Sequence, residues 1–87
     1  MPKFDGAIVK EQGITFAIVV VKPSVLSAST SRTEEVRESY TQFFPGMHII
    51  LMAQNSRGVP TYQGDTNIVN FLSRVDPRRI PWKTFSF

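Results

Sequence analysis

Two short apolar stretches decide the fold of this chain, ITFAIVVV at residues 14–21 and MHIILMA at residues 47–53. Both are rich in branched aliphatic side chains and are shorter than a core helix. They therefore predict strands that are buried on both faces of a sheet, as in parallel pairs. The polar segment between them has helical spacing, so strand, helix and strand together predict a βαβ unit with two parallel strands.

Two weaker strands flank this unit. Residues 4–10 alternate loosely, and Gly6 within them predicts a bulge or an irregular entry. The turn at residues 11–13 predicts a hairpin with residues 14–21. Residues 59–63 follow a turn at residues 55–58 and predict a short strand. Pro60 has no backbone N–H to donate, so this strand is expected at an edge of the sheet.

Capping residues and apolar spacing predict a first helix between the two apolar stretches. It begins at Ser31 or at Thr30, with Glu34 completing a capping box, and it ends at Pro45-Gly46. One apolar stripe on this helix consists of Val36, Tyr40, Phe43 and Phe44.

A second helix is predicted near the C-terminus. It begins at Asp65 or Thr66 as the cap and ends at Asp76-Pro77. Its buried stripe consists of Ile68, Phe71, Leu72 and Val75. Residues 78–87 form an apolar tail with two prolines and no regular pattern, although three of the last six residues are aromatic.

The resulting order is β-β-α-β-β-α plus the C-terminal tail. We predict a single α+β domain over residues 1–87, with a four-stranded mixed sheet and two helices. Its second and third strands are central and parallel through the βαβ crossover. If both helices pack on one face, the opposite face would expose more apolar area than a monomer normally shows. The tail, a helix on that face or a second copy of the chain would then have to cover it.

Composition excludes several kinds of site. The chain of 87 residues has no cysteine, which excludes disulfides, thiolate zinc sites and cysteine nucleophiles. Its glycines form no phosphate-binding loop or dinucleotide fingerprint, so we expect no cofactor. We expect no signal peptide, and the apolar runs are far shorter than the ~20 residues of a membrane span. The expectation is a cytoplasmic protein without membrane contact.

Catalytic groups are sparse. His48 is the one histidine and lies inside an apolar strand, where a hydrogen-bonded structural role is the more common one; a metal site is not expected. Most acidic residues are explained by helix boundaries, which leaves Asp5 and Glu11 beside an edge strand. No pair stands out as general acid and base, so no catalytic residue is assigned. An enzyme that uses His48 with a nearby carboxylate remains an alternative.

A basic, aromatic C-terminal segment is the strongest candidate for a binding surface. Residues 1–45 carry equal numbers of cations and anions, so residues 46–87 carry the whole net charge of +3. Five residues form the candidate contact with an anion or nucleic acid: Arg74, Arg78, Arg79, Trp82 and Lys83. The alternative is that the aromatic side chains are buried and the arginines are solvated near a helix end.

These observations give three functional hypotheses. The first is a non-catalytic interaction module that forms a homodimer through a sheet face or an edge strand. The second is nucleic-acid binding through the C-terminal segment, which the sequence favours less. The third is the His48 enzyme.

Overall fold

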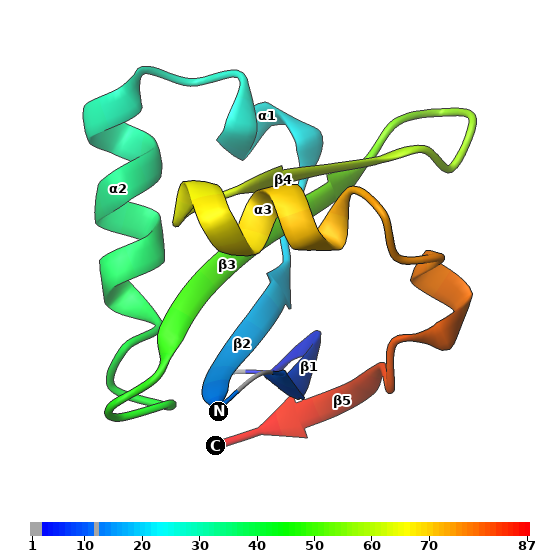
Figure 1. Cartoon of the computed structure of the whole chain (residues 1–87). Helices are drawn as coiled ribbons and strands as arrows, with labels where there is room; N and C mark the ends of the chain where they lie inside the picture. The colour runs from blue at the N-terminus through cyan, green and yellow to red at the C-terminus, as the bar shows by residue number, and fades with distance from the viewer. Residues whose placement is uncertain (1–2, 12) are drawn as a thin grey trace.

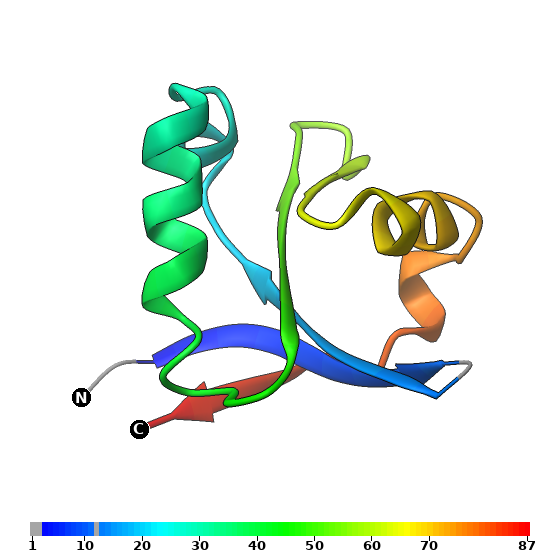
Figure 2. The same cartoon turned by 60° about the vertical axis from the view of Figure 1, so that its left-hand side comes forward.

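The protein is a mixed sheet with helices on both faces (Figures 1 and 2). The computed structural model describes residues 3–11 and 13–87. Within them the sheet has five strands in the order β4-β3-β2-β1-β5. The strands are β1 (Lys3–Glu11), β2 (Ile14–Val20), β3 (His48–Gln54), β4 (Pro60–Gln63) and β5 (Lys83–Ser86). The α+β class is therefore confirmed. The central β2 and β3 are parallel as predicted, and all other neighbours are antiparallel.

The prediction of four strands is wrong, because the C-terminal tail forms a fifth. Strand β5 pairs antiparallel with β1, with Phe85 opposite Phe4 and Lys83 opposite Gly6. It is four residues long and follows Pro77 and Pro81, so its own sequence contains too little alternation to predict a strand. The pairing depends on the free outer side of β1, which lies about 80 residues earlier in the chain.

Three α-helices and one 3-10 helix stand where two helices were predicted, in the described part of the chain. They are α1 (Pro23–Leu26), α2 (Thr30–Ser39), α3 (Thr66–Leu72) and η1 (Pro77–Arg79). The additional α1 begins at Pro23, whose fixed φ and missing N–H suit a first helical position. The short η1 follows Asp76, which caps it.

The boundaries of the two predicted helices differ from expectation. Neither Ser31 nor Thr30 caps α2; Ser29 does, and its hydroxyl accepts from the Arg32 amide at 3.3 Å. Helix α2 ends at Ser39 instead of continuing to Pro45, although the predicted stripe still packs on the sheet, Val36 from the helix and the other three residues from the turns that follow. Asp65, one of the two predicted caps, begins α3, but the helix ends at Leu72 and not at Asp76-Pro77 as predicted.

The helices lie on opposite faces of the sheet, so both faces have a core (Figure 2). The α3-side core consists of Ala7, Phe16, Ile18, Ile50, Met52, Ile68, Leu72 and Ile80. The α2-side core consists of Ala17, Val19, Phe44, Ile49, Leu51 and Phe85. Neither face of the central strands is left uncovered, so the premise of a dimer through an open sheet face does not hold.

Gly6 lies in regular sheet and not in a bulge. It pairs with Val19 on one side and Lys83 on the other. A Cβ at this position would collide with the carbonyl oxygen of Ile18 and would lie 3.5 Å from the Phe85 ring. A glycine here lets three strands approach closely. The predicted turn at residues 11–13 includes Gln12, which lies outside the described residues, and Gly13 has a φ of 79°.

Candidate functional site

The predicted basic surface is partly neutralised within the protein itself. Arg78 donates to Asp76, with Nη2 at 2.9 Å from Oδ2, and its side chain is 90% exposed. These hydrogen bonds from Arg78 hold the pKa of the Asp76 carboxyl below its usual value. The same carboxylate accepts from the Arg78 amide at 2.9 Å and so caps η1. One of the four predicted cations therefore has a structural role in closing the turn.

Trp82 is held against the body of the protein. It is half-buried, packs on the α3-side core, and its indole Nε1 donates to the carbonyl of Pro77 at 2.8 Å. Its remaining surface lines a groove of about 380 Å³ together with Lys83 and Asp5. The Asp5 carboxylate in that groove accepts from the Thr84 hydroxyl at 2.7 Å. The groove thus combines one cation with one anion.

The remaining predicted cations, Arg74, Arg79 and Lys83, are exposed. The structure therefore keeps the charges of the predicted contact at the surface but fixes its only tryptophan by packing and a hydrogen bond. Lys83 also lies over the ring of Phe85, with Nζ at 4.8 Å from the ring centroid. Whether this segment binds nucleic acid stays a prediction.

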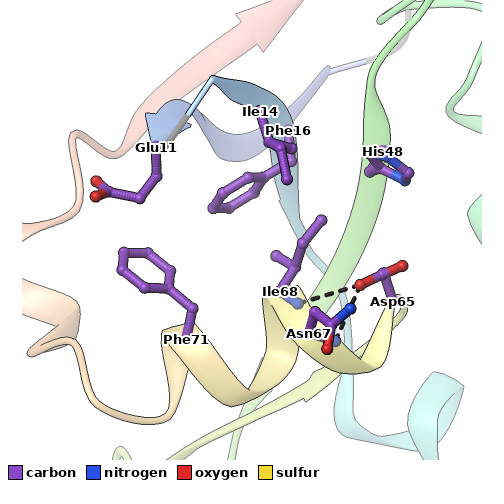
Figure 3. A pocket seen from close by; sticks show the side chains of 8 residues that line it. All are labelled: Glu11, Ile14, Phe16, His48, Asp65, Asn67, Ile68 and Phe71. Atoms are coloured by element: carbon purple, nitrogen blue, oxygen red, sulfur yellow. Dashed lines mark hydrogen bonds between the residues drawn. The ribbon is translucent and has the colours of Figure 1, made fainter.

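His48 does not have the buried structural role that was expected for it. It is exposed at the start of β3 and lines a cavity of about 190 Å³ between the β1–β2 hairpin and α3 (Figure 3). Glu11 from the end of β1 and Asp65 from the start of α3 line the same cavity. The fold thus places the histidine and two carboxylates along one cavity, with Glu11 apart from His48 and Asp65. The lining residues are Glu11, Ile14, Phe16, His48, Asp65, Asn67, Ile68 and Phe71.

The carboxylate of Asp65 orders one wall of this cavity. Its Oδ1 accepts from the amides of Asn67 and Ile68 at 3.0 and 3.2 Å, which fixes the first turn of α3. The aromatic part of the lining comes from β2 and from the end of α3: the rings of Phe16 and Phe71 lie 6.5 Å apart and nearly perpendicular, at 79°. Figure 3 shows Glu11 on one side of these rings and the Asp65 carboxylate with His48 on the other.

Sequence reasoning did not connect these residues. Glu11 and Ile14 are paired at the end of the hairpin, so both lie at the mouth of the cavity. The hairpin was predicted and could have placed them together. That α3 crosses this face next to His48 could not be read from the sequence, because the side of the sheet that a helix covers depends on tertiary packing.

A cluster of aromatic rings surrounds the β5 edge. It consists of Phe4, Tyr40, Phe43, Phe44, Phe85 and Phe87. Phe85 is 9% exposed, whereas Phe87 is 42% exposed and lies 4.7 Å from Phe43 between ring centroids. Strand β5 ends the sheet order in the described part of the chain, so its outer side has no strand beside it. An open edge and an exposed aromatic ring thus occur together.

Other features are few. Among the described residues, no three His, Asp or Glu side chains gather as a metal site requires. Within the same residues, no helix is both long and apolar enough to cross a membrane. Comparison with protein-family models, curated proteins and solved structures finds no match.

Proposed function

We propose that this protein is a non-catalytic interaction module that forms a homodimer by antiparallel pairing of the β5 edges of two copies. The observation that carries the proposal is the combination of an open edge strand with the exposed ring of Phe87. An edge strand presents unpaired backbone N–H and C=O groups that another strand can satisfy. We favour a second copy of the chain as the partner, because two identical edge strands can pair antiparallel across a two-fold axis.

Symmetry restricts the register of such a pair. A continuous sheet requires a two-fold axis perpendicular to it, so residues that face each other must lie on the same face. Pairing centred on Phe85 places Lys83 opposite Phe87 of the partner subunit. Side chains two residues apart on a strand lie on the same face, so Lys83 and Phe87 share the face of Phe85. This is the face of the α2-side core. This register covers the exposed Phe87 ring and adds a cation–π pair at each end.

The expected dimer is weak. A strand of four residues gives a small contact, below the size of a stable obligate interface. Sedimentation velocity from low micromolar to near-millimolar protein is the suitable measurement, and we expect a reversible monomer–dimer equilibrium with a micromolar dissociation constant. A sedimentation coefficient that stays monomeric over the whole range would refute the proposal.

Charge substitutions test the register. Phe87→Lys places two lysines opposite each other in the Phe85-centred pair and should abolish dimerisation. Adding Lys83→Glu to this variant restores opposite charges at the same positions and should recover the dimer. Val59→Lys is the matched control, since Val59 is 54% exposed next to β4 at the other edge of the sheet. If Val59→Lys disrupts the dimer and Phe87→Lys does not, the interface is at the β4 edge and not at β5.

Nucleic-acid binding is the second candidate, and the exposure of Arg74, Arg79 and Lys83 favours it. Binding through phosphate contacts should weaken steeply as salt rises. A fluorescent single-stranded oligonucleotide titrated at low salt provides the test. The combined Arg78→Ala and Arg79→Ala variant should reduce binding, and no binding by the unmodified protein at low salt would refute this candidate.

A further inference from the structure

We propose that the cavity beneath α3 binds a small organic ammonium ion that carries an apolar or aromatic group. The site is independent of the β5 edge. Strand β5 pairs with residues 3–6 of β1, whereas Glu11, which lines the cavity, is at the opposite end of that strand. Ligand binding in the cavity and dimerisation through β5 can therefore be confirmed or refuted separately.

The charge of the lining favours a cation. The whole chain carries +3, yet none of the eight described lining residues is Lys or Arg, and two of them, Glu11 and Asp65, are carboxylates. These two carboxylates lie on different sides of the cavity (Figure 3). A positive ligand between them would be attracted from both sides, and a negative one repelled.

The first turn of α3 does not provide a competing anion site. Its amides at Asn67 and Ile68 already donate to Asp65 Oδ1. Among the described residues, both hydrogen bonds to this carboxylate end on Oδ1, so Oδ2 is available for a ligand. The backbone donors of this turn are therefore already bonded to Asp65, and the Oδ2 atom of Asp65 can still accept a hydrogen bond from an ammonium group.

The walls favour an apolar group on the cation. The half-buried ring of Phe71 lines the cavity, Phe16 lies in edge-to-face contact with it at 2% exposure, and Ile14 at the mouth is 45% exposed. Aromatic faces attract ammonium ions, and apolar side chains favour burial of the rest of the ligand. The volume of about 190 Å³ corresponds to roughly six water molecules at the liquid density, which suits a single ring or a short alkyl chain.

Nuclear magnetic resonance titration with three probes of one shape tests the charge selectivity. Benzylammonium, benzyl alcohol and benzoate differ at the polar group and share the ring. We expect benzylammonium to shift the signals of Ile14, Ile68 and Phe71 and to reach saturation, benzyl alcohol to bind more weakly, and benzoate to leave these signals unchanged. Equal or tighter binding of benzyl alcohol or benzoate would overturn the proposal, as would the absence of any shift with benzylammonium.

Variants test the residues. Glu11→Gln and Asp65→Asn should each weaken the binding of benzylammonium by about two- to fivefold, which is the contribution of one exposed ion pair. Asparagine at position 65 can still accept from the helix amides, so the fold of α3 is kept. Glu38→Gln is the matched control, since Glu38 is exposed on α2 and does not line this cavity. An equal loss in the control would assign the effect to net charge and overturn the site.

Discussion

Replacing Phe85 by alanine tests whether the C-terminal strand is part of the folded core. Phe85 is 9% exposed and belongs to the α2-side core. Its ring lies 5.3 Å from Phe44 in an edge-to-face pair and 5.6 Å from Phe4 in a stacked pair, measured between centroids. The substitution therefore removes a buried ring that joins β5 to β1 and to the turn after α2.

The expected loss of stability follows from the burial. Phenylalanine-to-alanine changes in cores cost about 3–5 kcal/mol. Because Phe85 stands on an edge strand, which can relax toward the gap, we expect the lower end, about 3 kcal/mol. The total stability expected for 87 residues is roughly 4–13 kcal/mol. Since each kcal/mol shifts the midpoint of a domain of this size by about 4–8 °C, Tm should fall by about 12–24 °C.

Urea unfolding at low micromolar protein, followed by circular dichroism and Trp82 fluorescence, measures this loss. Trp82 packs on the α3-side core, so coincident transitions would show that the two cores unfold together. Phe87→Ala is the matched control, because this ring is 42% exposed and its loss should cost about 1 kcal/mol or less. A loss below about 1 kcal/mol for Phe85→Ala, or equal losses for the two variants, would refute the assignment of β5 to the core.

Three further substitutions have defined outcomes. Tyr62→Phe should raise the free energy of unfolding by about 1 kcal/mol, because the Tyr62 hydroxyl is buried and has no partner among the described residues, and burial raises the pKa of Tyr62; a loss of that size in urea unfolding would contradict this. Gly6→Ala should cost about 1–3 kcal/mol in the same measurement, since its Cβ collides with the Ile18 carbonyl; an unchanged midpoint would argue against the close strand approach. Arg78→Ala should raise the pKa of the Asp76 carboxyl toward 3.8, as carbon-detected titration can follow. Because the pKa of Asp76 is lower in the folded than in the unfolded protein, its carboxylate contributes stability at pH values above its unfolded pKa. This contribution is lost as pH falls through the folded pKa, so the variant that lacks it should lose less stability on acidification.

Local patterns predicted the central part of the fold correctly. Apolar runs of seven or eight residues were enough to locate β2 and β3, and the helix between them required these strands to be parallel. The cap of α3 was narrowed to Asp65 or Thr66 because a capping side chain acts within its own turn, and Asp65 is the one that caps. The errors concern features that depend on distant partners: β5 needs the outer side of β1, and Gly6 needs its neighbours on both sides.

The placement of α3 explains why the candidate cavity was missed. The apolar stripe of this helix was predicted, but a stripe does not say which face of a sheet it covers. With α3 opposite α2, the surplus apolar surface disappears, and His48, Glu11 and Asp65 come to line one cavity. The placement of α3 that covers the second sheet face therefore also forms the cavity for which we propose a small ligand.

In the C-terminal segment, the aromatic side chains of Trp82 and Phe85 pack inward and the basic side chains of Arg78 and Arg79 are exposed. Trp82 packs on one core and Phe85 on the other, so the aromatic residues hold the last strand to both sides of the sheet. Arg78 and Arg79 are exposed on η1, which precedes both aromatic residues. Changes at these arginines should therefore leave both cores intact. Because Arg78 also closes the turn through Asp76, a loss of oligonucleotide binding in Arg79→Ala alone would reflect phosphate contacts, whereas a loss of the dimer in Phe87→Lys would reflect pairing at the β5 edge. The two surfaces share Lys83, but Arg79 and Phe87 each belong to one of them only, so substitutions at Arg79 and Phe87 test the two proposals separately.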